Sequence, residues 1–130
     1  MPVRIEAIMM DCRDERRLSA FWTSALGYEV AVDQPGDWIV LQDPSVTGPS
    51  IGIQVVPETK VVKNRVHLDL MPTAGELESE FRRLENLDAR RVRYVENEPD
   101  ESPWIMTDPD GNEFCCVRPP WEPRQPRPEA

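Results

Sequence analysis

The chain has 130 residues, 39% of them apolar and 30% charged, so its length fits one compact domain with an apolar core. Fifteen Lys and Arg residues oppose 24 Asp and Glu residues, which gives a formal net charge of −9. This acidic balance disfavours binding to nucleic-acid phosphates and to anionic membrane surfaces. We therefore expect neither a nucleic acid nor a membrane as a partner.

The sequence also limits the expected location. Its longest apolar stretch, within residues 5–12, is interrupted by Glu6 and Asp11 and is too short to span a bilayer. The first residues lack the pattern of a secretory signal, so a cytoplasmic location is the default expectation. An odd number of cysteines in a chain that needs no disulfide framework predicts reduced thiols at Cys12, Cys115 and Cys116.

The first half of the chain predicts a strand, a helix and three further strands. Residues 3–11 form the first strand. Asp14 is the predicted N-cap of a helix with apolar residues at helical spacing, and Gly27 is its C-cap. The three further strands are predicted at 28–32, 38–40 and 50–56.

The second half repeats this order. A strand is predicted at 65–71, and Thr73 and Glu76 form a capping-box pattern before an apolar helical stripe. The stripe consists of Leu77, Phe81, Leu84 and Leu87, and three strands follow at 91–95, 104–106 and 113–117. The repeated order predicts an α+β fold in which two tandem βαβββ modules form a curved sheet with a central cleft.

The expected domain covers residues 1–118, with modules at about 3–58 and 64–118. Residues 119–130 hold five prolines, which exclude a helix interior or a central strand. We expect this proline-rich tail to be extended or disordered, with Trp121 as its anchor.

Several motifs support a family resemblance over residues 3–118. They are the doubled βαβββ order, Ala-Leu-Gly-Tyr at 25–28, His-Leu-Asp-Leu at 67–70 and Asp-Pro-Asp-Gly-Asn at 108–112. Together they resemble the vicinal oxygen chelate superfamily, which includes glyoxalase I, bleomycin and fosfomycin resistance proteins and extradiol dioxygenases. The nearest likeness is to the glyoxalase-like domains. The resemblance implies a small-molecule ligand and a homodimer, and it does not single out one reaction.

The resemblance also implies where a divalent metal would bind. Metal-binding members place His, Glu or Gln on the first and last strands of each half. His67, the only histidine, matches one position, Gln54 a second, and Cys115 a third, with Glu113 as an alternative on the same strand face. Ala7 matches the fourth position and offers no donor atom, so the implied metal site is incomplete. His67 with Cys115 would suit a soft ion such as zinc.

His67 and Asp69 are also candidate catalytic residues without a metal. Two residues apart on a strand, they point to one face, whereas Leu68 and Leu70 point to the other. An imidazole beside a carboxylate can transfer protons near neutral pH. Two alternatives remain open: His67 is a buried, hydrogen-bonded residue or a ligand contact, and Asp69 caps a turn or pairs with Arg65.

The repeat places Trp38 and Trp104 in equivalent positions. Facing the cleft, they would sandwich a planar ligand, and facing the helices they would belong to the core. Met106 either lines the pocket or fills a gap in the core. The candidate ligand-binding residues are therefore His67, Gln54, Trp38, Trp104, Met106 and Cys115.

Three functions remain open from the sequence. The first is a glyoxalase-like small-molecule-binding protein with a degenerate metal site, either a lyase, isomerase or dioxygenase-type enzyme or a resistance protein. The second is an enzyme that uses a divalent ion held by His67, Gln54 and either Glu113 or Cys115. The third is a non-catalytic interaction domain whose proline-rich tail engages a partner.

Overall fold

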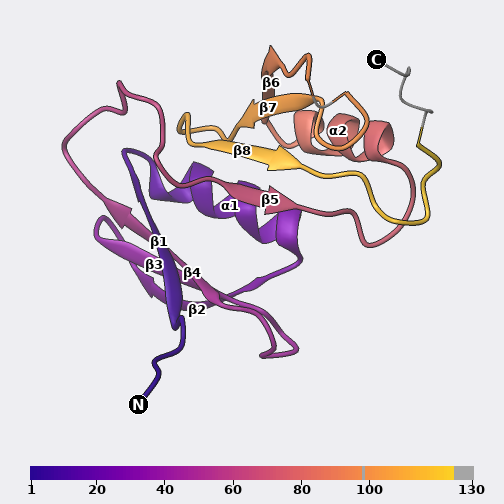
Figure 1. Cartoon of the computed structure of the whole chain (residues 1–130). Coiled ribbons are helices and arrows are strands. Elements are labelled where there is room, and N and C mark those ends of the chain that lie inside the picture. Colours follow the sequence, from indigo (N-terminus) through magenta and orange to yellow (C-terminus); the bar gives the residue numbers. More distant parts are fainter. Residues whose placement is uncertain (98, 125–130) are drawn as a thin grey trace. The chain divides into compact units, whose positions relative to one another are not determined.

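The computed structural model describes residues 1–97 and 99–124 of a chain that divides into two compact units, Met1–Val62 and Lys63–Ala130. In the described residues, each unit contains one four-stranded sheet and one helix (Figure 1). The second unit repeats the element order of the first. The predicted α+β fold of two βαβββ modules is therefore confirmed.

The first unit consists of β1 (Ala7–Cys12), α1 (Glu15–Leu26), β2 (Glu29–Gln34), β3 (Trp38–Gln42) and β4 (Ser50–Val55). Its strand order is β1-β4-β3-β2, with β1 parallel to β4 and the other neighbours antiparallel. The Asp14 side chain accepts a hydrogen bond from the backbone N–H of Arg17, and Gly27 ends α1 at a φ of 69°. Both predicted caps of α1 are confirmed.

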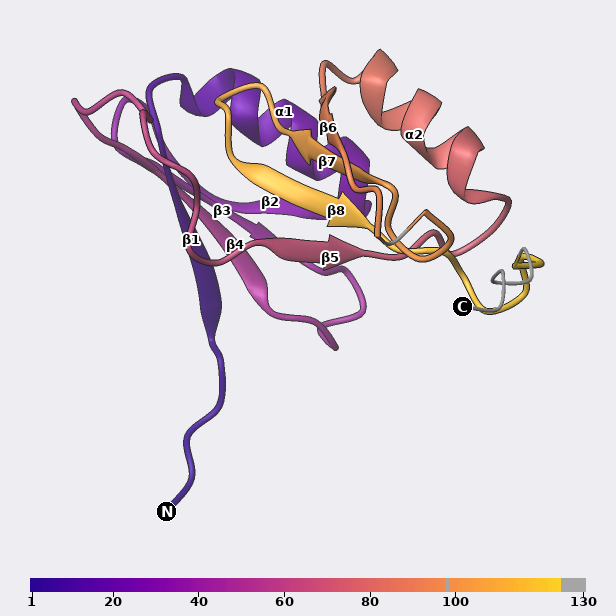
Figure 2. The same cartoon turned by 45° about the horizontal axis from the view of Figure 1, so that its top comes forward.

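The second unit consists of β5 (Leu68–Leu70), α2 (Leu77–Asn86), β6 (Arg90–Tyr94), β7 (Trp104–Thr107) and β8 (Glu113–Cys116). Its order, β5-β8-β7-β6, and its pairing directions match those of the first unit. Figure 2 shows α2 running alongside β6. The first strand of each module is shorter than predicted, since β1 begins at Ala7 and β5 spans three residues.

Each sheet has one face of buried apolar side chains. In the first unit, α1 contacts β3 and β4, where Ile39, Leu41, Ile51 and Ile53 are at most 2% exposed. Because successive side chains of a strand point to opposite faces, the residues between them lie on the other face. We call the face turned away from the helix of its own unit the open face.

The C-terminal tail, and not the predicted capping box, caps α2. Glu76 occupies the N-cap without a side-chain hydrogen bond. Instead, the backbone N–H of Leu77 donates to Oε2 of Glu122 at 2.9 Å. The indole Nε1 of Trp121 donates to the carbonyl oxygen of Gly75 at 2.9 Å. The capping-box prediction was wrong because α2 begins at Leu77, with Glu76 and not Thr73 at the N-cap, and a carboxylate 45 residues further along the chain accepts the first helical N–H.

Further ion pairs hold the tail against its own unit. Arg118 pairs with Glu122 at 2.6 Å, and Arg124 pairs with Glu101. Trp121 therefore anchors the tail as expected, but it is not the single anchor, because Glu122 and Arg124 also bind the second unit. Residues 119–124 form neither helix nor strand, as their prolines predicted. The rest of the tail, 125–130, lies outside the described residues.

Two smaller expectations can be compared with the structure. Cys12, Cys115 and Cys116 are buried thiols that form no disulfide, as the cysteine count predicted. Among the described residues, the helices lack the length and apolar character needed to cross a bilayer.

The cap that Glu122 provides can be tested by Glu122→Gln, which keeps the size of the side chain and removes its charge. We expect the free energy of unfolding to fall by about 1 kcal/mol, because a neutral amide binds the helix N-terminus and Arg118 less strongly. Urea denaturation followed by far-UV circular dichroism measures this change. Glu58→Gln, at an exposed position, is the control, and an equal loss in both variants would contradict the proposed cap.

Candidate functional site

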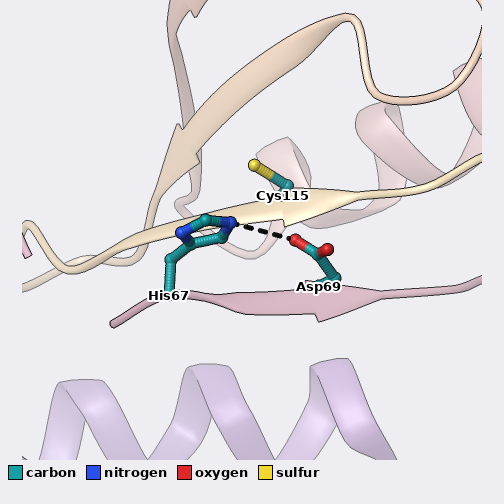
Figure 3. Close-up of side chains that lie close together, drawn as sticks. All are labelled: His67, Asp69 and Cys115. Atoms are coloured by element: carbon teal, nitrogen blue, oxygen red, sulfur yellow. Dashed lines mark ion pairs between the residues drawn. The ribbon is translucent and has the colours of Figure 1, made fainter. Parts of the chain in front are cut away.

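Three polar side chains come together on the open face of the second sheet. His67 directly precedes β5, Asp69 lies within β5, and Cys115 is the Cα partner of Asp69 on the parallel neighbour β8. One imidazole nitrogen, one carboxylate oxygen and Sγ of the cysteine all lie within 4.8 Å of one another. Figure 3 shows His67 and Asp69 projecting to the same side of β5, with Cys115 on the adjacent strand. We call these three residues the polar trio.

Strand alternation explains why the polar trio shares a face. Leu68 and Leu70 lie on the opposite face of β5, where their β8 partners Phe114 and Cys116 are buried. The apolar residues thus anchor β5 and β8 against the core. As predicted, His67 and Asp69 lie on the other side of β5 from the two leucines.

Nε2 of His67 lies 3.2 Å from Oδ1 of Asp69, which is within hydrogen-bond distance. An ionised carboxylate only accepts hydrogen bonds, so Nε2 is the nitrogen of His67 that donates a proton toward Asp69. Nδ1 then carries the lone pair that can accept a proton. The side chains of His67 and Asp69 are 49% and 58% exposed, which contradicts the alternative of a buried structural histidine.

The two adjacent cysteines have different surroundings. Cys115 is 5% exposed and belongs to the polar trio, whereas Cys116 is fully buried on the α2 side. Burial, with a smaller contribution from the negative charge of Glu80 on α2, raises the pKa of the Cys116 thiol to about 12. Cys116 therefore remains a neutral thiol of the core at physiological pH.

The predicted metal ligands are only partly brought together. Glu113 lies on the same strand face as Cys115, but its Oε2 accepts a hydrogen bond from the backbone N–H of Asn64 at 2.9 Å. Gln54 is an exposed residue of β4 in the first unit. The structure thus groups His67 with Cys115 and adds Asp69 to the set of donors. The sequence signal for Asp69 was its spacing of two residues from His67.

The strand registers show which residues correspond between the two units. In the first sheet Asp11 pairs with Gln54, and one more pair follows before both strands end. In the second sheet Asp69 pairs with Cys115, and again one more pair follows. Asp11 therefore corresponds to Asp69, and Gln54 corresponds to Cys115, as predicted for Gln54.

This register places Met9, and not Ala7, where the second unit has His67. Counting back from the helix start pointed to Ala7 because it assumed strand-to-helix connections of equal length. The connection is two residues long between β1 and α1 and six residues long between β5 and α2. The first unit therefore offers a thioether sulfur at this position and no imidazole.

Trp38 lies on the open face of the first sheet. The Cα partner of Trp38 on β4 is Gln54, and Trp38 is 36% exposed. The corresponding partner of Cys115 on β7 is Ile105. Ile105, and not Trp104, therefore corresponds to Trp38 in the structure. The sequence repeat aligns the two tryptophans, but the pairing of β7 with β8 is shifted by one residue relative to that of β3 with β4.

Trp104 lies on the helix side of the second sheet. The guanidinium carbon of Arg91 lies 5.8 Å from the centre of the Trp104 ring and 4.8 Å from that of Phe81 on α2. Met106 lies on the same side, is fully buried and pairs with Phe114. Met106 is part of the core, and Trp104 is half-buried on the helix side, so we do not include either in the candidate site.

The chain matches a known protein family over most of its length. Residues 7–117 match the family described as the glyoxalase-like domain. The chain therefore belongs to the glyoxalase-like domain family, within the vicinal oxygen chelate superfamily. No curated protein matches it.

Solved structures show the same fold at low sequence identity. A mutant of the fosfomycin resistance protein FosX from Listeria monocytogenes, complexed with Mn(II) and 1S,2S-dihydroxypropylphosphonic acid, is 14% identical with a TM-score of 0.71, and 90% of each chain is covered. A possible glyoxalase from Bacillus cereus is 12% identical with a TM-score of 0.65, covering 89% of this chain and 99% of that chain. Lactoylglutathione lyase from Agrobacterium tumefaciens is 16% identical with a TM-score of 0.58, covering 89% and 93%. At these identities the likeness establishes the fold alone.

The buried state of Cys116 predicts a pH effect on stability. The thiol ionises near pH 9.0 in an ordinary environment and near pH 12 in the folded protein. Ionisation therefore favours the unfolded chain, so the stabilising contribution is complete below pH 9 and is lost as the pH approaches 12. Urea unfolding at pH 8, 9, 10 and 11 should show a shallower decline for Cys116→Ala than for the parent protein. Parallel declines would contradict this assignment.

Proposed function

We propose that this chain is a small-molecule-binding protein of the glyoxalase-like family whose ligand contacts the polar trio. The observation that carries this proposal is the convergence of His67, Asp69 and Cys115 on one open sheet face. Polar side chains that converge on an accessible face can orient a ligand. The FosX complex with its dihydroxypropylphosphonic acid is an example of a small molecule bound by the same fold.

The polar trio supports acid–base chemistry on a bound ligand. With the Nε2 proton directed at Asp69, Nδ1 of His67 is the atom that accepts a proton from the ligand. The Asp69 carboxylate at 3.2 Å then stabilises the imidazolium that forms. His67 would act as the general base and Asp69 as the residue that orients it.

A second candidate function is a divalent-metal-dependent enzyme, supported by the donor types of the polar trio. Nitrogen, carboxylate oxygen and thiolate sulfur form a donor set that suits zinc. The His67 nitrogen and the Asp69 oxygen are already 3.2 Å apart, and the Cys115 sulfur lies within 4.8 Å of its partners, so small side-chain rotations would bring the three donors to one ion. Two of the three side chains are half-exposed and can turn to do so. The donor set therefore fits the ion, which would polarise a ligand oxygen when bound.

Ligand binding at the polar trio can be tested by thermal shift with a metabolite library. Compounds that raise the melting temperature of the parent protein should lose this effect in His67→Ala, because a ligand stabilises only the state that binds it. Glu58→Gln serves as the control and should keep the shifts. Shifts that are unchanged in His67→Ala would refute the proposed site.

Metal binding can be tested by titrating the purified protein with zinc and measuring heat by calorimetry. We expect one ion per chain, and a loss of affinity of at least about tenfold in His67→Ala and in Cys115→Ser, since each removes one of three ligands. Glu113→Gln is the matched control on the same strand and should bind normally. The absence of stoichiometric binding, or an equal loss in the control, would eliminate the metal-dependent alternative and leave the first proposal standing.

A further inference from the structure

Exposed apolar side chains precede β1. Ala7, the first residue of β1, pairs with Ser50, the first residue of β4, so residues 1–6 extend past the end of the sheet (Figure 2). We call residues 1–6 the β1 extension. Within it, Val3 is 96% exposed and Ile5 is 73% exposed. Apolar residues spaced by two share one face of an extended chain, so the β1 extension has the pattern of a strand without a neighbour in the described part of the chain.

A strained valine lies in the first unit. Val46 has a φ of 58°, a left-handed conformation that is strongly disfavoured for a β-branched residue. The second unit makes the corresponding turn with Gly111, and each residue donates its backbone N–H to the aspartate carbonyl oxygen three residues earlier, at 2.9 and 3.0 Å. The Val46 side chain is 70% exposed, so burial in the core does not offset the strain. A costly exposed valine at a glycine-like position supports contact with a partner.

Val46 and Ile5 line one cavity. Its volume is about 410 Å³, and its walls come from residues 4–6, Gln42 and residues 46–50. This volume lies in the range of cavities that bury a bound group. The exposed side chains of Val46 and the β1 extension thus surround a hollow that apolar groups of another chain can fill.

The charges of the β1 extension favour a second copy as that other chain. Arg4 and Glu6 flank Ile5 and pair with each other at 2.7 Å, with side chains 83% and 75% exposed. When two copies pair as antiparallel strands centred on Ile5, Arg4 of one lies opposite Glu6 of the other, and Val3 lies opposite Ala7. Opposite charges across antiparallel strands stabilise the pair, and like charges destabilise it. The β1 extension is therefore complementary to itself.

We infer that two copies of this chain associate through antiparallel pairing of their β1 extensions, with apolar side chains of each copy in the cavity beside Val46 of the other. The contact is isologous, because the same surface serves on both copies. Burial of the exposed apolar side chains drives the association, and the charges of Arg4 and Glu6 fix its register. The inference concerns residues of the first unit and does not depend on the polar trio.

Sedimentation velocity of the full chain over a range of concentrations tests this inference. A buffer of about 0.15 M salt screens the net charge of −9 on each copy beyond roughly 8 Å and leaves close contacts in place. Because the contact is small, we expect a weak dimer with a Kd of about 10–100 µM. A monomer at all concentrations up to about 1 mM would overturn the inference.

Charge reversal tests the proposed register. Arg4→Glu and Glu6→Arg should each weaken the dimer at least about tenfold, because each places like charges opposite one another. The double variant Arg4→Glu/Glu6→Arg restores opposite charges and should recover the parent Kd to within about threefold. Glu58→Arg reverses an exposed charge elsewhere and is the matched control. Equal Kd values in the parent and both single variants, or no recovery in the double variant, would overturn the inference.

Val46→Gly separates contact with a partner from a structural role. Measured below the Kd, its Tm should rise, because glycine adopts a positive φ without strain. Its dimer should nevertheless be at least about threefold weaker, since the side chain that contacts the partner is gone. Val61→Gly, at another exposed valine, is the control and should leave the Kd unchanged. A Kd that is unchanged in Val46→Gly, or equally weakened in Val61→Gly, would overturn the inference.

The His67→Ala variant distinguishes this inference from the proposed function. It should form the dimer with the parent Kd, because His67 lies in the second unit and outside the proposed contact. A failure of the polar trio to bind ligand or zinc therefore leaves the present inference unaffected, and the reverse also holds. A dimer that is lost in His67→Ala and kept in Arg4→Glu would lie elsewhere on the chain and would overturn the inference.

Discussion

Parallel pairing between the first and the last strand of each module is the constraint on which the candidate site depends. It places residues that are distant in the sequence side by side, as it does for Asp69 and Cys115. The third strand of each module then pairs with the last strand, and the second strand pairs with the third, both in antiparallel orientation. A thiol and a carboxylate 46 residues apart become neighbours through backbone hydrogen bonds, with no need for any attraction between the two side chains.

Burial of the opposite face holds this register in place. A slip of β8 by one residue would move Cys116 to the open face and bring Cys115 and Glu113 to the face that packs under α2. Such a slip would expose Phe114 and bury a carboxylate without a partner, and both changes cost free energy. The apolar residues of β5 and β8 therefore position the polar trio although they touch no ligand.

The duplicated fold carries different chemistry in its two halves. The second unit has an imidazole, a carboxylate and a thiol at the positions where the first has Met9, Asp11 and Gln54. The acidic residue is the one shared feature, and the residues around it differ in both hydrogen-bonding capacity and affinity for metals. A shared fold leaves such positions free to diverge, because the open faces contribute little to the core.

The sequence by itself determined the repeated element order, both caps of α1, the family and the common face of His67 and Asp69. These features depend on patterns within a few residues of one another, which local backbone geometry makes readable. Only the tertiary structure decided that Cys115 and not Glu113 lies beside His67, and that Glu122 caps α2. It also decided that Trp38 lies on the open face of its sheet, whereas Trp104 lies on the helix side of the other sheet. Each of these outcomes depends on the register between distant segments. Because side chains alternate with a period of two, an uncertainty of one residue in that register exchanges the open face for the buried one.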